Sequence, residues 1–334
     1  MRSVISHVPA ITTGCAVLLL ACAGCGPRID SFAPITGRGQ DVDNLFRLSL
    51  ILSLGIFLLV AGVMIYIMLR FRGQPEEPEP PQTPGHRRLE IIWTATPALL
   101  LAGLFALTLQ TMVTITRPEP SPLRIQVIGH QWWWEFRYPD LGVVTANELH
   151  VPVGQPLQLE ITAADVIHSF WVPRFGWKMD AIPQKINLMR LRVNQAGTVD
   201  GGCTEYCGTQ HAWMRILVVA EPPGQFNSWV GLQRQPAPSP ATPTAIDGQQ
   251  IFLRNTCVNC HTLSGTPAQG QVGPVLTHLG SRETLGAGVL ENTPENLARF
   301  INHIQEVKPG ALMPGYNFSD PELTALVTYL EGLR

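Results

Sequence analysis

Two long runs without a charged residue constrain this chain more than any other feature. They cover residues 49–69 and 91–115. As a helix rising about 1.5 Å per residue, the first run spans roughly 32 Å, enough to cross the hydrocarbon core of a bilayer. The second run is slightly longer and contains Pro97. A buried helix of a soluble protein is the alternative for each, but two such lengths so close together favour a membrane-spanning helical hairpin over 40–116.

The charges around these runs predict the orientation of the hairpin. Between the runs lie Arg70, Arg72, Arg87 and Arg88, whereas Asp41, Asp43, Arg117 and Glu119 lie outside them. Arginine and lysine gather in cytoplasmic loops. The 70–90 loop is therefore expected in the cytoplasm, and everything after Thr116 on the extracytoplasmic side of the membrane.

The N-terminus agrees with export. Residues 1–25 place one arginine before an apolar run that ends in small residues, which is the pattern of a secretory signal peptide. A cysteine directly after small residues also resembles a bacterial lipoprotein processing site, with Cys22 and Cys25 as competing positions. An ordinary signal peptide or a retained anchor is the alternative. We expect a multi-pass protein of the bacterial inner membrane.

Composition narrows the function classes. Hydrophobic residues make up 45% of the 334 residues and charged residues 14%, which fits a membrane protein. The formal net charge of −2 argues against nucleic-acid binding, which needs a basic face. Beyond the N-terminus the cysteines form two close pairs, 203/207 and 257/260. Neither pair closes a loop long enough to act as a disulfide scaffold.

Residues 117–222 are predicted to form an all-β sandwich or barrel. Short segments rich in β-branched residues, such as "LRIQV" and "LQLEI", alternate between apolar and polar positions and are separated by Gly, Pro and Asn. Many short strands over about 100 residues are typical of that architecture.

The stretch "CTEYCGTQHAWM" raises the question of a metal. It contains Cys203, Cys207, His211 and Met214, and His168 in "DVIHSFWVP" is another histidine in reach. Zinc would use two Cys and two His and leave the methionine idle. Thiolate and imidazole with a weak axial methionine favour copper, and two thiolates suit two bridged copper ions. A disulfide remains the third alternative.

These segments resemble subunit II of the haem–copper cytochrome c oxidases. "HQWWWEF", "DVIHSFWVP", "MDAIP" and "CTEYCGTQHAWM" match that family in order and approximate spacing through residues 40–222. The resemblance implies a cupredoxin-like barrel with a dinuclear copper-A centre. The implied ligands are the terminal His168 and His211, the bridging Cys203 and Cys207, the weakly bound Met214, and Glu205 through its backbone carbonyl.

The resemblance also implies three further roles. The Glu205 side chain would reach a magnesium ion shared with subunit I. Trp132 would mark the surface where electrons enter, although tryptophans in a strand are more often core. Glu90, at the start of the second span, would lie at the mouth of a proton-uptake path, although a carboxylate there is usually a solvated charge near the helix dipole.

A second redox module follows a Pro-rich tether. Residues 223–245 comprise a short helix and the stretch "QPAPSPATPTA", whose composition is typical of a semi-rigid linker. Beyond it, "CVNCH" is the haem c attachment signature, with Cys257 and Cys260 as thioether residues and His261 as an axial ligand. A thioredoxin-like motif is the alternative, but the expected βαβ context is missing.

The second axial ligand of the haem is expected to be Met313, in "KPGALMPGY", because flanking Gly and Pro suit a loop that presents a thioether. His303 and His278 are the rivals. Helical patterns at "GQQIFLRNTCVNCH", "TPENLARFINHIQ" and "SDPELTALVTYLEGL" predict a small all-α domain over 246–334 that resembles class I cytochrome c. The junction of both modules resembles the caa-type oxidases of bacteria.

The sequence therefore predicts the electron-transfer subunit of a terminal cytochrome c oxidase. Electrons would pass from haem c to copper A and on to subunit I, where oxygen is reduced, so no catalytic residue is expected in this chain. Expected partners are subunit I, the other oxidase subunits, and cytochrome c or a cytochrome bc-type complex as donor. A nitric oxide reductase subunit and a copper-handling lipoprotein are the alternatives; a quinol oxidase subunit should lack these copper ligands.

Overall fold

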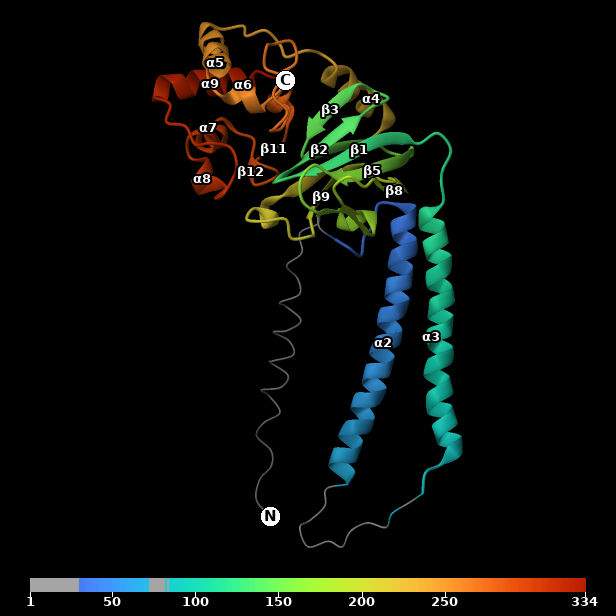
Figure 1. Cartoon of the computed structure of the whole chain (residues 1–334). Coiled ribbons are helices and arrows are strands. Elements are labelled where there is room, and N and C mark those ends of the chain that lie inside the picture. Colours follow the sequence, from blue (N-terminus) through green and yellow to red (C-terminus); the bar gives the residue numbers. More distant parts are fainter. Residues whose placement is uncertain (1–29, 72–81, 83) are drawn as a thin grey trace, which may run out of the picture.

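The computed structural model describes residues 30–71, 82 and 84–334. The predicted signal peptide and both candidate lipidation cysteines, Cys22 and Cys25, lie outside the described residues. Two long helices form a shaft, and a β-sandwich sits at one end of it (Figure 1). The C-terminal helical domain lies beside the sandwich, on the side away from the shaft.

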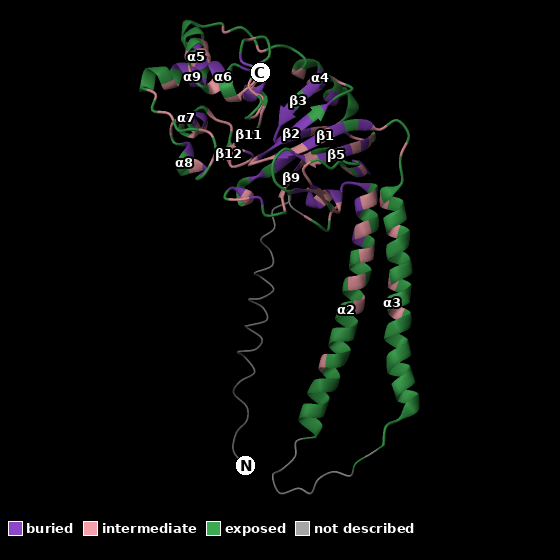
Figure 2. Cartoon of the chain, in the orientation of Figure 1, coloured by how far each residue is buried: buried purple, intermediate pink, exposed green. Residues whose placement is uncertain are grey.

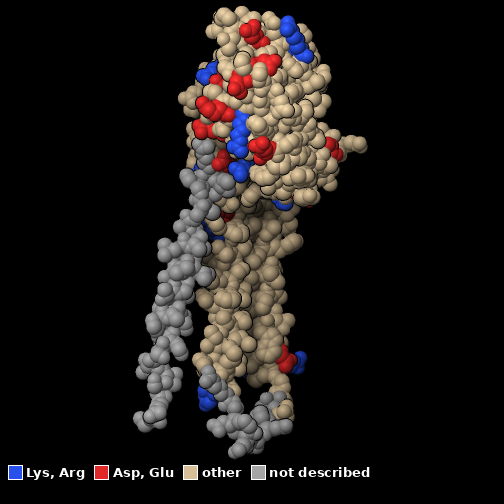
Figure 3. Space-filling view, turned by 90° about the vertical axis from the view of Figure 1, so that its left-hand side faces the viewer, with Lys and Arg blue, Asp and Glu red and all other residues tan. Residues whose placement is uncertain are grey.

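The shaft consists of helices α2 (Gly37–Arg70) and α3 (Arg87–Thr116). Both are long and apolar enough to cross a membrane, with mean hydropathy of 2.7 and 2.0 over their most apolar windows. Most of their side chains are exposed (Figure 2). In the space-filling view charged side chains gather on the β-sandwich and the C-terminal domain and at the far end of the shaft (Figure 3). The rest of the shaft is almost free of them. These features agree with the predicted hairpin.

The β-sandwich is built from two five-stranded sheets. The first has the order β3-β2-β1-β5-β8 and comprises β1 (Leu123–His130), β2 (Trp133–Tyr138), β3 (Val143–Ala146), β5 (Pro156–Ala163) and β8 (Asn187–Arg192). The second has the order β4-β10-β9-β6-β7 and comprises β4 (Glu148–Pro152), β6 (His168–Trp171), β7 (Lys178–Ala181), β9 (Gly197–Cys203) and β10 (Arg215–Glu221). The pairs β1–β5 and β4–β10 are parallel.

Alternation along the strands creates the core between the sheets. In β1, Ile125 and Val127 are fully buried, and in β5 the same holds for Leu159 and Ile161. Their neighbours along each strand point away from the core, because successive side chains of a strand point to opposite faces. The predicted all-β domain is confirmed.

Arg38 joins the shaft to the sandwich. Its guanidinium donates to the carbonyls of Ile115 and Arg190, both at 2.8 Å, and of Arg117 at 2.6 Å. Glu119 lies 3.3 Å from the same group. One side chain at the start of α2 therefore binds the end of α3 and strand β8 together, which fixes how the sandwich sits on the helices.

The C-terminal domain follows helix α4 (Pro223–Gln233). Its elements are α5 (Pro243–Arg254), α6 (Cys257–Cys260), the short strands β11 (Thr284–Leu285) and β12 (Leu290–Glu291), α7 (Pro294–Asn302), α8 (Ile304–Val307) and α9 (Asp320–Glu331). Side chains cap helices α7 and α9: Thr293 accepts from the amide of Asn296, and Ser319 forms a capping box with Glu322. The small β-hairpin is an addition to the expected all-α domain.

The first helix of this domain differs from the prediction. A continuous helix was expected from "GQQ" through "CVNCH", but α5 ends at Arg254 and α6 is a separate turn. Asn255 has an extended backbone. Its side-chain amide donates to the Ile251 carbonyl at 2.8 Å and so provides a hydrogen bond for a carbonyl in the last turn of the helix. The helix also begins earlier, at Pro243, so the end of the Pro-rich stretch forms its first turn.

Candidate metal and haem sites

The second sheet brings the predicted copper ligands together at one end. Strand β6 begins at His168, and β9 ends at Cys203 beside it, since Phe170 pairs with Cys203 across the two strands. The chain then forms a loop and a short 3-10 turn, His211–Trp213, before β10 begins. Residues 203–214 form what we term the copper loop, which is held at both ends by β-strands.

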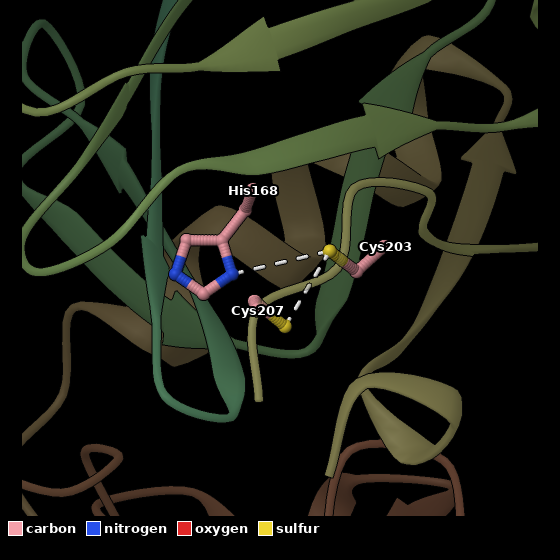
Figure 4. A group of neighbouring side chains, drawn as sticks. All are labelled: His168, Cys203 and Cys207. Atoms are coloured by element: carbon pink, nitrogen blue, oxygen red, sulfur yellow. Dashed lines mark hydrogen bonds between the residues drawn. The ribbon is translucent and has the colours of Figure 1, made fainter. Parts of the chain in front are cut away.

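The sulfur and nitrogen atoms of this loop and of His168, the candidate metal donors, converge. The Sγ atoms of Cys203 and Cys207 lie 3.8 Å apart. The Nδ1 atom of His168 lies 3.9 Å from the first sulfur, and Nδ1 of His211 lies 3.6 Å from the second. His168, Cys203 and Cys207 point toward one another from two strands and the loop (Figure 4).

The two weaker predicted ligands each lie next to a different sulfur of the pair. The Met214 sulfur, which is buried, lies 3.9 Å from Sγ of Cys207. The backbone carbonyl of Glu205 lies 3.2 Å from Sγ of Cys203, while the Glu205 side chain is exposed. The structure thus brings all six predicted ligand residues to one place, including the carbonyl, and leaves the Glu205 carboxylate at the surface.

The chemistry of these donors suits a soft metal. Both cysteines are free thiols and not a disulfide. A hydrogen bond between the two sulfurs lowers the pKa of Cys203 and raises that of Cys207, so the pair shares one proton. Thiolate bonds to a metal are about 2.3 Å long, so two sulfurs at this separation can bridge metal ions. Two thiolates, two imidazoles and a thioether fit copper better than zinc.

Asp165 is a site residue that the sequence interpretation missed. Its Oδ1 atom lies 2.8 Å from Nε2 of His168, and its carboxylate accepts backbone hydrogen bonds from Gln131 and Val166 at 2.6 and 2.7 Å. Burial lowers the pKa of His168, but the bond to Asp165 and the contact with Cys203 outweigh burial, and the net pKa is raised. Binding Nε2 in this way leaves Nδ1 directed at the sulfurs. The sequence feature that could have identified Asp165 is its position, three residues before the histidine.

Trp132 contacts the copper loop directly. Its indole Nε1 donates to the carbonyl of Cys207 at 3.0 Å, and the side-chain amide of Gln131 donates to the same oxygen at 2.8 Å. Trp132 precedes β2, so only the next two tryptophans lie in the strand, where successive side chains point to opposite faces. Trp134 packs in the core against His168, and Trp133 lies on the other side.

A cavity of about 430 Å³ lies in the C-terminal domain beside Trp132 and Trp133. Cys257, Cys260 and His261 line it together with mostly apolar side chains. The His261 Nδ1 atom lies 2.7 Å from the carbonyl of Pro274, so Nε2 is free to bind iron. A Cβ atom at Gly273 would lie 2.7 Å from the His261 ring, so the position of that ring leaves no space for a side chain at residue 273. These residues fit haem c.

The three candidates for the second axial ligand lie in different places. Met313 lines the cavity, whereas His303 and His278 do not. His303 is exposed and faces Glu306 at 3.4 Å. His278 is buried, but its Nε2 atom lies 3.1 Å from the carbonyl of Gln235. Glu90 lies in the first turn of α3, at the end of the shaft far from both sites (Figure 1).

Three sequence families match separate parts of the chain. They are "Cytochrome C oxidase subunit II, transmembrane domain" over residues 33–110, "Cytochrome C oxidase subunit II, periplasmic domain" over 142–221, and "Cytochrome c" over 245–334. The first covers the helical hairpin, the second most of the sandwich with the copper loop, and the third the domain that contains the haem cavity.

Individual relatives agree with these matches. Cytochrome c oxidase subunit 2 of Alkalihalophilus pseudofirmus is 35% identical over 95% of this chain and 94% of its own length. That of Bacillus sp. (strain PS3) is 33% identical over 95% of each chain. The solved periplasmic domain of cytochrome oxidase subunit II from Bradyrhizobium japonicum is 34% identical and covers 35% of this chain and 96% of that one, with a TM-score of 0.34.

Fold and sites together define a membrane-anchored electron-transfer chain with a metal-binding β-sandwich and a cytochrome c domain. The chain belongs to the cytochrome c oxidase subunit 2 family. It is part of an oxidase complex and associates with other subunits of that enzyme. Its cytochrome c domain implies haem c, and its subunit II domain implies copper A.

Proposed function

We propose that this chain passes electrons from a haem c in its C-terminal domain, through a dinuclear copper centre in its sandwich, to subunit I of the oxidase. The observation that carries the proposal is the position of Trp132. This residue lines the haem cavity, and its indole donates to the carbonyl of Cys207. One side chain therefore contacts both candidate sites, which supports Trp132 as the point where electrons enter the copper site.

Each candidate ligand has a defined role in this proposal. Cys257 and Cys260 attach the haem covalently, and His261 and Met313 bind its iron. The copper ligands are His168, Cys203, the carbonyl of Glu205, Cys207, His211 and Met214. When bound, each centre supplies a one-electron carrier. The residues hold the donor atoms in place, and Asp165 keeps the His168 ring in one orientation.

Further roles concern the surroundings of the chain. We place both soluble domains on the extracytoplasmic side, as the arginine-rich 70–90 loop and the attachment of haem c outside the cytoplasm suggest. The exposed Glu205 carboxylate would bind a magnesium ion at the contact with subunit I. Glu90, exposed at the cytoplasmic end of α3, would take part in proton uptake. Cytochrome c or a cytochrome bc-type complex is the proposed donor.

Spectroscopy of the full-length chain, purified in detergent, tests these assignments. We expect a mixed-valence two-copper EPR signal together with a low-spin haem c. Cys207→Ser should abolish the copper signal and leave the haem spectrum intact, whereas His261→Ala should do the reverse. Ser228→Ala, on the exposed face of α4, is the control and should retain both signals. A colourless protein that binds zinc would contradict the copper assignment.

A further inference from the structure

The haem domain, residues 243–334, contacts the sandwich through its β-hairpin. The amide of Arg215 donates to the carbonyl of Ala287 at 3.1 Å. Across the same interface, the Glu148 carboxylate accepts from the amide of Thr284 at 2.9 Å and from its hydroxyl at 3.2 Å. Backbone groups of the two domains are therefore bound in a defined register, beside strands β4 and β10.

Apolar contacts fill the space next to these hydrogen bonds. Trp133 and Ala146 of the sandwich form a buried cluster with Ala287 of the haem domain. A Cβ atom at Gly310 would lie 3.0 Å from the Thr209 side chain, so the loop before Met313 runs close to the copper loop. The two domains thus meet both at the hairpin and at the loop 308–313.

Lys308 is the charged residue that connects these contacts. Its ammonium donates to the carbonyl of Trp132 at 3.0 Å and to the carbonyl of Gly286 at 2.9 Å. The first partner belongs to the sandwich and the second to the β-hairpin of the haem domain. The lysine is only 5% exposed and lines the haem cavity. It therefore lies between the haem cavity and the copper loop.

The contacts of Trp132 extend this connection to a copper ligand. The carbonyl of Trp132 accepts from Lys308, and the indole of the same residue donates to the carbonyl of Cys207. Two consecutive hydrogen bonds thus link the haem-cavity wall to the copper loop. Lys308 and the copper loop therefore bind two different groups of the same residue, Trp132.

We propose that Lys308 is a positioning residue for electron transfer, which holds the haem domain against the copper loop by binding Trp132 and Gly286 together. The proposal extends the proposed function, and it rests on that function only for the second of the two measurements below. The first measurement concerns domain docking alone and is valid whichever metal the copper loop holds.

The physical reason is the cost of leaving buried polar groups without partners. Burial lowers the pKa of Lys308 to about 8, and the nearby Cys207 opposes that shift. The ammonium donates to two carbonyls, and hydrogen bonds from a charged donor are stronger than those between neutral groups. A methionine at this position would fill similar space but would leave two carbonyls without their donor, a situation that penalises the docked arrangement.

Hydrogen–deuterium exchange on the full-length, cofactor-loaded chain in detergent measures docking. The amides of Arg215 and Thr284 are bonded across the interface, so their exchange reports separation of the domains. In Lys308→Met we expect their exchange to accelerate about tenfold or more. The amides of Val153 and Leu297, which bond within their own domains, should keep their wild-type rates.

Three further variants make the result specific. Lys308→Arg keeps the charge and the donors, and should restore most of the protection. Lys185→Met removes an exposed lysine of the sandwich and should change nothing. If Lys308→Met fails to retain haem, Lys308→Gln, a neutral donor of shorter reach, decides the question in the same assay. Wild-type exchange at Arg215 and Thr284 in the folded Met or Gln variant overturns the proposal.

The second measurement is the rate of electron transfer from haem c to copper after rapid photoreduction of the haem. Lys308→Met should slow this step about tenfold or more by the same loss of docking, with the absorption spectra of both centres unchanged. An unchanged rate in a folded variant also overturns the proposal. If the wild-type chain transfers no electron, the proposed function fails, while the exchange result on docking still holds.

Discussion

Asp165 binds the ring of His168 on the side opposite Cys203: its Oδ1 lies 2.8 Å from Nε2, and the cysteine sulfur lies 3.9 Å from Nδ1. The histidine is fully buried, so the ring has no alternative partner in solvent. Its orientation and its tautomer are therefore set by a residue that does not itself reach the donor cluster.

Asp165→Asn should weaken copper binding without preventing folding. An amide cannot accept from Nε2 as strongly as a carboxylate, and loss of such an outer partner typically costs about 10–100-fold in metal affinity. Titration of the copper-loaded chain with a chelator measures the effect. Asp140→Asn, at an exposed carboxylate that faces Arg124 at 3.7 Å, is the matched control. Equal affinities in the two variants would contradict the role of Asp165.

Gly273→Ala should reduce covalent attachment of haem. The added methyl group would lie 2.7 Å from the His261 ring and force that ring out of place. We expect a severalfold lower yield of holo-protein, measured as haem absorbance per chain. Gly224→Ala, in α4, adds a methyl group with nothing within 4 Å and should give the wild-type yield. A normal haem yield for the first variant would show that the ring tolerates displacement.

Met313→His should keep the haem low-spin but remove the sulfur-to-iron absorption band and lower the haem potential, because Met/His ligation raises it. His303→Ala should leave both unchanged, since this exposed histidine lies outside the cavity lining. Optical spectra and a redox titration of the full chain measure both properties. Absence of the band from the wild-type chain would contradict methionine ligation and favour a histidine.

Stability should depend on pH through Glu148. Burial raises the pKa of this carboxyl, and Arg282 and Thr284 compensate only in part. A raised pKa means that the folded state binds the proton more tightly than the unfolded state. The stabilising contribution is present below the pKa of an ordinary glutamate and is lost as pH rises through the folded pKa.

Glu148→Gln removes this contribution while keeping an acceptor for Thr284. The unfolding free energy of the wild type should therefore fall, relative to that of the variant, as pH rises from about 4. Denaturant unfolding at several pH values gives the difference directly. Parallel pH profiles for the two proteins would argue against a buried, titrating Glu148.

Arg38→Met should loosen the sandwich from the helices. The substitution leaves the carbonyls of Ile115, Arg117 and Arg190 without this donor, at a cost of about 1–3 kcal/mol for each one that stays buried. Thermal unfolding in detergent should show a lower midpoint. Arg254→Met, whose guanidinium donates to the exposed Gln250 side chain at 3.1 Å, should have little effect. Equal midpoints would mean that water replaces the arginine.

Much of the fold and of the candidate copper site could be predicted from local sequence patterns, because each of these patterns involves residues that lie close together in the sequence. The uncharged runs gave the hairpin, alternation gave the strands, and the Cys-His-Met spacing gave residues that converge in space. The same reasoning extended the first haem-domain helix too far, because apolar periodicity continues past Asn255 although the backbone does not.

The residues that sequence patterns did not identify act across long separations. Lys308 lies 176 positions from its partner Trp132, which the resemblance had singled out, and Arg38 reaches residues up to 152 positions away. Only the tertiary arrangement of strands and domains brings such pairs together, and no periodicity marks them in advance. Asp165 is the exception, since it lies three positions from the residue that it orients.

The docked haem domain limits which surface of this chain an external electron donor can reach. It occupies the side of the sandwich at Trp133 and Ala146, so a visiting protein of similar size finds that surface already taken. Val272 and Leu312 remain exposed at the outer edge of the haem cavity, at 68% and 72%. A visitor would therefore set the rate of the first electron transfer by its concentration, whereas the second step, inside the chain, would proceed at a rate that dilution does not change.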